Sequence, residues 1–397
     1  MTAPELARKA KAMTRREIIV KAVAGELTWL QAAQILGVSP RHMRRIREKY
    51  EQFGVDGLED ARGGRPRRRR VSTRTIEKVC QLKRDVYPDF SMKHFHEKVT
   101  EEHGLQLSYT LLRSVLQEAG LVERAPGRGQ YRRKRERRPM TGMLVHLDGS
   151  THEWIAGLPK SDLIVALDDA DGRILYARFF PEEGTMSTMH SLLSILKRFG
   201  RFAELYTDRG SHFCRTPKAD EPSVTDGQVS RALKTMGIRQ ILARSPQARG
   251  RSERAFGTLQ GRLPQELRLA GVRDYDAANL YLERKFIKDF NRRFTVTPAQ
   301  PESAFLPVAG LDLDLIFAEQ HDRVVAADNT ISFENIKFQL PPSKSRIHYA
   351  RCPVTVHRLV DGTLAVTYLG QELARFRGDG KLLSSPKRSS ARRKTAA

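Results

Sequence analysis

The chain has 397 residues, 40% of them hydrophobic, which is long and apolar enough for several domains with their own cores. Its 70 Lys and Arg residues outnumber its 46 Asp and Glu residues, giving a formal charge of +24. A charge of this size indicates a polyanionic partner, and nucleic acid is the first candidate. Ribosomal proteins are also basic but are usually smaller, and a membrane-surface binder needs an amphipathic anchor that we do not find.

The cysteines give no sign of a disulfide framework or a zinc site. Cys80, Cys214 and Cys352 are far apart, with no C-x-x-C pair and no histidine cluster around them, which is typical of a reducing compartment. No stretch approaches the ~18 consecutive apolar residues that a membrane span needs. We therefore expect a soluble cytoplasmic protein with no membrane partner.

Residues 14–57 have the pattern of three short helices. Apolar spacing predicts a helix over Arg15–Ala24, a second over Trp29–Leu36 after the N-cap Thr28, and a third from Pro40 to about Phe53. Gly37 suits the positive φ of a tight turn between the last two helices, and Ser39 is placed to cap the third helix, which begins with proline.

The stretch QAAQILGVSPRHMRRIREKY resembles a helix-turn-helix unit, with Ala33 as the small residue where the two helices cross. The resemblance implies that the last of these helices faces the major groove and the phosphates of DNA. Its candidate DNA contacts are Arg41, His42, Arg44, Arg45 and Arg47. The alternative is a plain three-helix bundle with a solvated basic face.

Two basic linkers separate the helical parts from each other and from the C-terminal two thirds of the chain. The first, DARGGRPRRRR, is too rich in Gly, Pro and Arg to form a core, so it is expected to be an extended arm on the phosphates or in a minor groove, or else a solubilising stretch. The second, Arg124–Arg138, holds eight basic residues and one acidic residue, and we expect a salt-sensitive hold on DNA. The candidate contacts in the linkers are Arg67, Arg68, Arg69, Arg70, Arg132, Arg133, Lys134 and Arg135.

Between the linkers, the pattern predicts helices over Thr73–Val86, Met92–His103 and Ser108–Ala119. The segment GLQLSYTLLRSVLQEAGLV looks like a second helix-turn-helix, with Tyr109 and Arg113 on its outer face as candidate DNA contacts. Its leucines are expected to be core in any case. Two such modules in tandem would read a longer DNA site than one.

Three acidic residues stand in distinctive settings after the second linker. Asp148 lies in MLVHLDGSTHEWI, which predicts a core strand, and Asp208 ends a second strand in ELYTDRGSHF. Glu253 lies in ARGRSERAFGTLQGRL, where apolar spacing through Phe256, Leu259 and Leu263 predicts a helix. Two strand-end aspartates and one helix glutamate can converge, and converging carboxylates hold hard cations such as Mg²⁺.

The other predicted core elements are strands over Asp162–Asp168, Arg173–Phe180, Ala203–Thr207 and Arg239–Leu242, and helices over Thr185–Phe199 and Ser223–Met236. Asp168, Asp169 and Asp171 compete as metal ligands, but Asp-Gly between two strands predicts a hairpin turn. The Pro-, Asp- and Ser-rich stretch from Cys214 to Gly227 predicts a surface loop. His212 is a further candidate to approach the metals or DNA, although a lone loop histidine usually has no such role.

The blocks TDRGSHF and GRSERAFGTLQGRL resemble the second and third motifs of DDE transposases and retroviral-type integrases, and the chain looks like an insertion-sequence transposase of the ISNCY group. The spacing from Asp148 to Asp208 (208 − 148 = 60) is ordinary for that family, whereas Asp208 to Glu253 (253 − 208 = 45) is longer than the compact retroviral pattern. The resemblance implies a ribonuclease H-like mixed α/β core, the catalytic and metal-binding set Asp148, Asp208 and Glu253, and two Mg²⁺ ions, with Mn²⁺ as a substitute. It also adds Arg249, Arg251 and Arg254 as candidate phosphate contacts.

After the core, Asp274–Arg293 predicts a helix with Tyr281, Phe286 and Phe290 inward, and NRRFTVTPAQPESAF resembles the stretch that closes these cores. From about Phe317 the period changes to two, with turns at Asp328-Asn329 and Asp361-Gly362. We predict a small β-barrel, which resembles the C-terminal barrels of Mu-like transposases. Its role is open between DNA binding, protein contact and capping of the core.

These patterns predict a multidomain α/β protein. The boundaries are 1–59 first helix-turn-helix, 60–71 linker, 72–123 second helical domain, 124–142 linker, 143–310 catalytic core, 311–378 β-barrel and 379–397 basic tail. The expected function is a DNA transposase that binds, cuts and joins double-stranded DNA ends as at least a dimer, in the bacterial nucleoid. The alternatives are a non-catalytic DNA-binding regulator derived from one, and a metal-dependent nuclease that does not join.

Overall fold

The computed structural model describes residues 16–58, 71–123, 136–213, 227–243, 250–342 and 346–384. The chain divides into two compact units, residues 1–81 and 82–397. Each unit has hydrophobic core residues of its own.

The first unit contains the predicted three helices, at 16–23, α2 (Trp29–Ile35) and α3 (Pro40–Phe53), followed by a 3-10 turn, η1 (Gly54–Leu58). Thr28 caps α2 and Ser39 caps α3, and Gly37 has φ +63° in the turn between them. Ala33 is 2% exposed and packs with Met43 and Ile46, as expected of the crossing point. The helix-turn-helix prediction is therefore confirmed.

The predicted second helical module consists of α4 (Thr73–Asp85), α5 (Met92–Glu101) and α6 (Tyr109–Glu118). The boundary between the two units runs through α4. Ser91 and Ser108 cap α5 and α6 by accepting hydrogen bonds from backbone amides, which explains where these helices begin.

The core of the second unit is a five-stranded mixed sheet in the order β3-β2-β1-β4-β5. The strands are β1 (Leu144–His152), β2 (Ser161–Asp168), β3 (Ile174–Phe180), β4 (Glu204–Thr207) and β5 (Arg239–Leu242). The pairs β1–β2 and β2–β3 are antiparallel, whereas β1–β4 and β4–β5 are parallel. The predicted mixed α/β core is thus confirmed.

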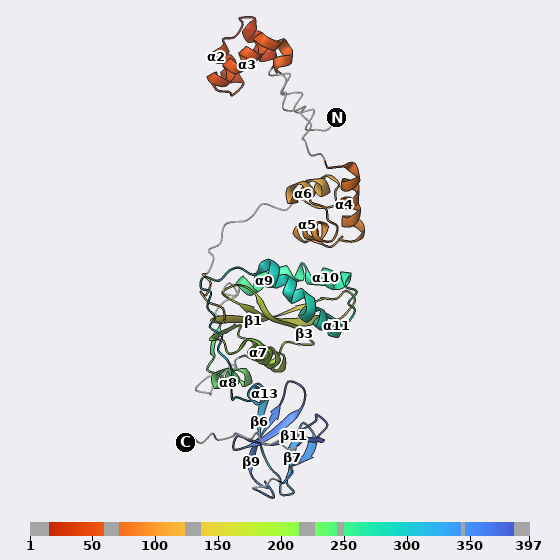
Figure 1. Ribbon diagram of the computed structural model, residues 1–397, viewed down its shortest axis with the longest axis vertical. Coiled ribbons are helices and arrows are strands. Elements are labelled where there is room, and N and C mark those ends of the chain that lie inside the picture. The colour runs from red at the N-terminus through yellow and green to blue at the C-terminus, as the bar shows by residue number, and fades with distance from the viewer. Residues whose placement is uncertain are drawn as a thin grey trace, which may run out of the picture. The chain divides into compact units, whose positions relative to one another are not determined.

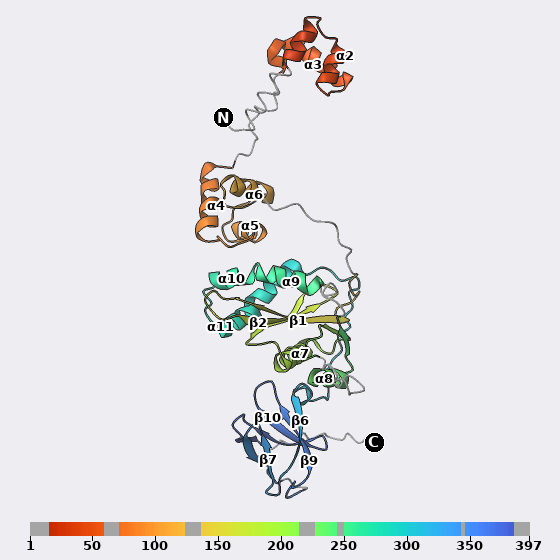
Figure 2. The same cartoon turned by 180° about the vertical axis from the view of Figure 1, so that it is seen from behind.

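Helices cover both faces of this sheet (Figure 1). On one face α7 (Thr185–Phe199) and α8 (Gln228–Thr235) pack on Val145, Leu147 and their neighbours. The other face carries α9 (Gly250–Gln260), α10 (Leu263–Leu269), α11 (Tyr275–Tyr281) and α12 (Ile287–Phe294). Figure 2 shows the same two layers from behind.

The helix predicted through Glu253 does not run on to Leu263. It ends at Gln260, and α10 begins at Leu263, because Pro264 has no amide to bond to the Gln260 carbonyl. The helix predicted over Asp274–Arg293 also differs from the expectation. It is interrupted between α11 and α12 by a π-helical segment, η4 (Leu282–Phe286).

The C-terminal part is a small β domain joined to the core through the short helix α13 (Leu313–Ile316). Strands β6 (Glu319–Val324), β9 (Pro353–Arg358), β10 (Leu364–Tyr368), β11 (Gln371–Phe376) and β12 (Leu382–Ser384) form a sheet in the order β12-β11-β10-β9-β6. Strands β7 (Thr330–Phe333) and β8 (Ile336–Gln339) form a separate hairpin.

The predicted turns of this β domain are present, with Asn329 at φ +64° and Gly362 at φ +80°. A closed barrel is not confirmed, because the described strands pair as an open sheet and a hairpin. What the structure shows is a small β domain around Val356, Val366 and Phe376.

Candidate active site

The first two predicted catalytic residues lie on neighbouring parallel strands. In the β1–β4 pair, Leu144 is opposite Glu204 and His146 is opposite Tyr206, a constant offset of 60 residues (204 − 144). Continuing this register by two residues places Asp208, the first residue after β4, opposite Asp148. Neighbouring strands are about 4.8 Å apart, so this continuation of the register would bring the two aspartate backbones close together.

Both aspartates belong to the face of the sheet that α9 covers. Across the antiparallel pair, Asp148 is opposite Val165, which packs in one cluster with Phe256 of α9. On β4, the ring of Tyr206 lies 5.1 Å from that of His146, and Asp208 follows two residues later on the same side. Asp148 is 7% exposed and Asp208 is half-buried.

The third predicted residue, Glu253, is exposed in the first turn of α9. Near the start of this helix, Arg251 forms an ion pair of 2.7 Å with Asp169, beside β1. At its end, Gln260 donates a hydrogen bond of 3.0 Å to Ser150 on β1. Glu253 and Gln260 are seven residues apart and so share one side of the helix. The structure therefore holds the Glu253 helix along the strand that carries Asp148.

Sequence reasoning missed Glu183, which approaches the middle of β1 beside Asp148. A side chain at Gly149, the residue after Asp148, would collide with its carboxylate. His212 lies 3.5 Å from Glu183, and its ring also flanks Gly210 beside Asp208. The one sequence signal for this contact is the glycine at 149, which leaves space for Glu183.

The side chains of Asp148, Asp208 and Glu253 do not form a metal-binding cluster in this structure. Among the described residues, no group of three or more His, Cys, Asp or Glu side chains is arranged to hold a metal ion. The β1–β4 register thus explains why Asp148 and Asp208 are expected near each other. Glu253 lies on the neighbouring helix α9, and its side chain is exposed.

The competing aspartates are structural, as the hairpin interpretation predicted. Asp168 accepts hydrogen bonds from the amides of Gly142 and Ala170, and Asp171 binds Arg173 at the turn into β3. Burial raises the pKa of Asp168 to about 6, although those amides act against the rise. The carboxylates of Asp168 and Asp171 stabilise the turn between β2 and β3.

Asp169 is almost fully buried and pairs with His146 and Arg251, each at 2.7 Å. Burial would raise its pKa, but the hydrogen bonds from His146 and the Arg138 amide, with the charge of Arg251, hold the pKa well below its usual range. Arg251, predicted as a phosphate contact, is therefore engaged in an internal ion pair. It fixes the start of the Glu253 helix.

The remaining DNA-binding candidates lie partly on helix surfaces and partly outside the described residues. On α3, Arg41, His42, Arg44, Arg45 and Arg47 are all exposed, and Arg47 pairs with Glu51. On α6, Tyr109 is exposed and Arg113 is half-buried, and on α9 Arg254 is exposed. Outside the described residues lie Arg67, Arg68, Arg69, Arg70, Arg132, Arg133, Lys134, Arg135 and Arg249.

No helix in the described part of the chain is both long and apolar enough to cross a membrane. Within the same residues the two cysteines, Cys80 and Cys352, are free thiols. Cys214 lies outside the described residues.

Residues 15–77 match the family model described as winged helix-turn helix. Across nearly the whole chain, the sequence is 32% identical to a putative transposase, y4bF, of Sinorhizobium fredii, over 91% of this chain and 79% of that protein. It is 27% identical to the transposase for insertion sequence IS1202 of Streptococcus pneumoniae, over 81% of this chain and 77% of that protein.

Two solved structures align with lower similarity. An intasome structure of simian T-cell lymphotropic virus covers 78% of this chain and 100% of its own at 15% identity and a TM-score of 0.34. The HTLV-2 integrase catalytic core domain in complex with magnesium covers 36% of this chain and 82% of its own at 16% identity and a TM-score of 0.28. TM-scores this low have no bearing on the site.

Proposed function

The chain belongs to the transposases, and on that basis we propose that it is a DDE transposase that cuts the ends of an insertion sequence and joins their 3′-OH groups to target DNA. The observation that carries the proposal is the β1–β4 pairing, which, continued by two residues beyond His146 and Tyr206, aligns Asp148 of β1 with Asp208, the residue after β4. Two carboxylates on one face of a sheet, beside a helix that carries Glu253, are the parts such a site needs.

The donor set fits a hard divalent cation. Asp148, Asp208 and Glu253 offer only carboxylate oxygens, the ligands that Mg²⁺ and Mn²⁺ prefer. When bound, two such ions would supply activation of the attacking oxygen and stabilisation of the leaving one. Three carboxylates side by side repel each other without a cation, so we expect Glu253 to join the two aspartates on metal binding.

The protein's own contribution is to position the DNA. In this proposal the basic side chains of α3 bind one segment of the DNA, and the exposed Arg254, whose Nε donates to the Gly250 carbonyl at 2.7 Å, contacts a phosphate at the site. Metal-dependent attack by water or a 3′-OH needs no protein nucleophile, so we propose no covalent protein–DNA intermediate.

The finer organisation is part of this proposal. It comprises a ribonuclease H-like core at 143–310, helical DNA-binding domains at 1–59 and 72–123, basic linkers at 60–71 and 124–142, a barrel-like domain at 311–378 and a basic tail at 379–397. Pairing of two element ends requires at least a dimer on DNA. We place the protein at the bacterial nucleoid because its substrate is there.

The test is product analysis with the full chain. A labelled DNA fragment carrying the element's ends is incubated with a plasmid target, with and without Mg²⁺. Metal-dependent joined products support the proposal. Cut but unjoined ends would favour a nuclease, and binding alone, under conditions that permit pairing of two ends, would favour a regulator.

A further inference from the structure

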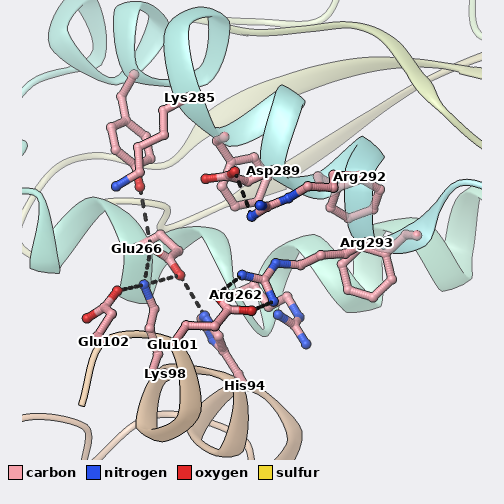
Figure 3. Close-up of a pocket in the computed structure, with 14 residues that line it drawn as sticks. His94, Lys98, Glu101, Glu102, Arg262, Glu266, Lys285, Asp289, Arg292 and Arg293 are labelled. Atoms are coloured by element: carbon pink, nitrogen blue, oxygen red, sulfur yellow. Dashed lines mark hydrogen bonds and ion pairs between the residues drawn. The ribbon is translucent and has the colours of Figure 1, made fainter. Parts of the chain in front are cut away.

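One side of α5 is bound to the core by charged side chains, the central ones largely buried (Figure 3). His94 Nε2 lies 2.7 Å from Glu266 of α10, and Lys98 donates to the same carboxylate at 2.9 Å. Tyr281 also donates to Glu266, at 3.4 Å. The contacts from α5 join residues about 170 positions apart along the chain, so they attach α5 to the core rather than stabilising the helix itself.

Two arginines of the core extend this contact. Arg262, just before α10, binds Glu97 with both terminal nitrogens, at 2.7 and 3.2 Å. Arg293 of α12 binds Glu101 in the same two-pronged way, with the first bond at 2.8 Å. We call these contacts the α5–core interface: His94, Glu97, Lys98 and Glu101 on α5 with Arg262, Glu266 and Arg293 on the core.

The centre of the interface is charged and largely buried, whereas the Glu101–Arg293 pair lies at its more exposed rim. The side chain of Glu266 is 15% exposed and that of Lys98 is 11% exposed. Burial would raise the pKa of Glu266, but the hydrogen bonds from His94 and Lys98 hold it at about 2. The carboxylate is thus ionised at every working pH, and the pairing is directional, since planar arginine forks and carboxylates fit in few orientations.

The other side of α5 carries α6. Phe95 and Val99 of α5 and Leu112 and Leu116 of α6 are all fully buried, and the two helices are in contact. The ring of His96 lies 5.8 Å from that of Tyr109, at the first turn of α6. The position of α6 therefore follows that of α5.

The core side of the interface is continuous with the helix that carries Glu253. Only Gly261 and Arg262 separate α9 from α10, and Arg262 is itself an interface residue. Gln260, at the end of α9, is bonded to Ser150 on the strand of Asp148. A displacement of α5 would thus be transmitted to a segment that is tied to the candidate catalytic strands.

We infer that the α5–core interface fixes the distance between DNA held by α6 and the strand cut at Asp148, Asp208 and Glu253, which makes Glu266 and Arg293 positioning residues. The inference rests on the proposed function. An error of about 1 Å in placing reacting atoms lowers rates by about a hundredfold. A rigid link of this kind therefore selects one phosphate among its neighbours.

The experiment maps cut positions at single-nucleotide resolution on DNA carrying the element's ends. In Glu101→Arg, repulsion from Arg293 loosens the interface, and we expect cuts at the wild-type phosphate to fall about tenfold relative to cuts at neighbouring phosphates. Affinity for the ends stays within about threefold, because rim charges contribute little. The double variant Glu101→Arg/Arg293→Glu re-forms this pair with reversed charges but loses the 3.3 Å pair between Arg293 and Glu97, so it should restore most of the cutting at the wild-type phosphate.

A matched control variant reverses the charge of a carboxylate outside the α5–core interface. Asp314→Arg breaks the 2.8 Å pair with Lys197, far along the chain from the interface, and should leave the cut position unchanged. An unchanged cut position in Glu101→Arg would overturn the inference, as would a loss of cutting that the double variant does not restore.

Amide hydrogen exchange of the protein without DNA measures the stability of the α5–core interface independently of DNA cutting. Amides of α5 should exchange faster in Glu101→Arg than in wild type and recover in the double variant. If the wild type cuts no DNA at all, the proposed function fails and the positioning role fails with it. If the wild type cuts and α5 exchange is insensitive to the substitution, the inference alone fails.

Discussion

In the first unit the five candidate DNA contacts of α3 are exposed, whereas in the second unit the charged side of α5 is bound to the core through Glu266, Arg262 and Arg293. Both helices are short, capped by serine and rich in charge. The two helices differ in the partners of their charged side chains. Charges that are already paired within the protein add little to DNA binding, whereas exposed cations are free to bind phosphates.

The largest effect on DNA affinity should come from α3. In the variant Arg41→Ala/Arg44→Ala/Arg45→Ala, DNA affinity should fall roughly a hundredfold. The slope of log affinity against log salt concentration should become less steep by about 0.9 for each lost phosphate contact. Fluorescence anisotropy over a series of salt concentrations measures both. The matched substitution on α5, Glu101→Gln, should change affinity by less than about twofold. Equal losses for the two helices would break the comparison.

A smaller effect, on stability rather than DNA binding, is expected at the α5–core interface. Glu266→Gln keeps the shape but removes the charge that Lys98 faces, and should lower the free energy of unfolding by about 2 kcal/mol. Urea unfolding can be followed by Trp154, which is fully buried in the second unit, in a Trp29→Phe background. The exposed ion pair between Lys197 and Asp314 provides the control. Asp314→Asn should change the free energy of unfolding by less than about 1 kcal/mol.

Helix α9 shows the same contrast between an exposed and an internally paired arginine within one turn. Arg254 is exposed, so Arg254→Ala should lower DNA affinity about fivefold without affecting unfolding. Arg251 is one of the partners of the buried Asp169, beside His146 and the Arg138 amide, so Arg251→Ala removes part of the compensation of this charge and should lower stability. Parallel binding and unfolding measurements on the two variants test this. The contrast is wrong if both variants change the same property.

The smallest effect concerns pH. Burial lowers the pKa of His94, so the folded protein binds this proton less readily than the unfolded chain does. Stability should therefore decline as pH falls below about 6.5, the unfolded value. In His94→Gln this part of the pH dependence should be missing. Unfolding curves at pH 7.5 and 5.5 for both proteins give the difference, and an identical pH dependence would exclude the effect.

Local signals made much of the fold predictable. The bounds of α3 follow from Ser39, Pro40 and Gly54, which act within one turn of the helix ends. The turn at Gly362 was predicted for the same reason, because Asp-Gly sets its own backbone geometry. The prediction of a closed barrel went further than the structure supports, since closure depends on distant pairings, such as β6 with β9.

The sequence predicted which residues belong to the candidate site but not how they are arranged in space. Sequence pattern pointed to Asp148 and Asp208, but their alignment depends on the β1–β4 register, which is set by pairing across 60 residues (208 − 148). Glu183 carries no local signal, and its approach becomes visible only beside Gly149. The charges of α5 have the pattern of a solvated face, so the α5–core interface could not be inferred before α10 was placed beside it.

The most direct test of the central claim is strand joining with pre-cut element ends, which isolates the chemistry from end recognition. Wild type is compared with Asp148→Asn, Asp208→Asn and Glu253→Gln, and with Asp314→Asn as a control, in the presence of Mg²⁺. We predict that each of the three substitutions reduces joining by at least about a thousandfold while end binding persists, and that the control joins normally. Joining that survives Asp208→Asn would contradict the assignment of this site.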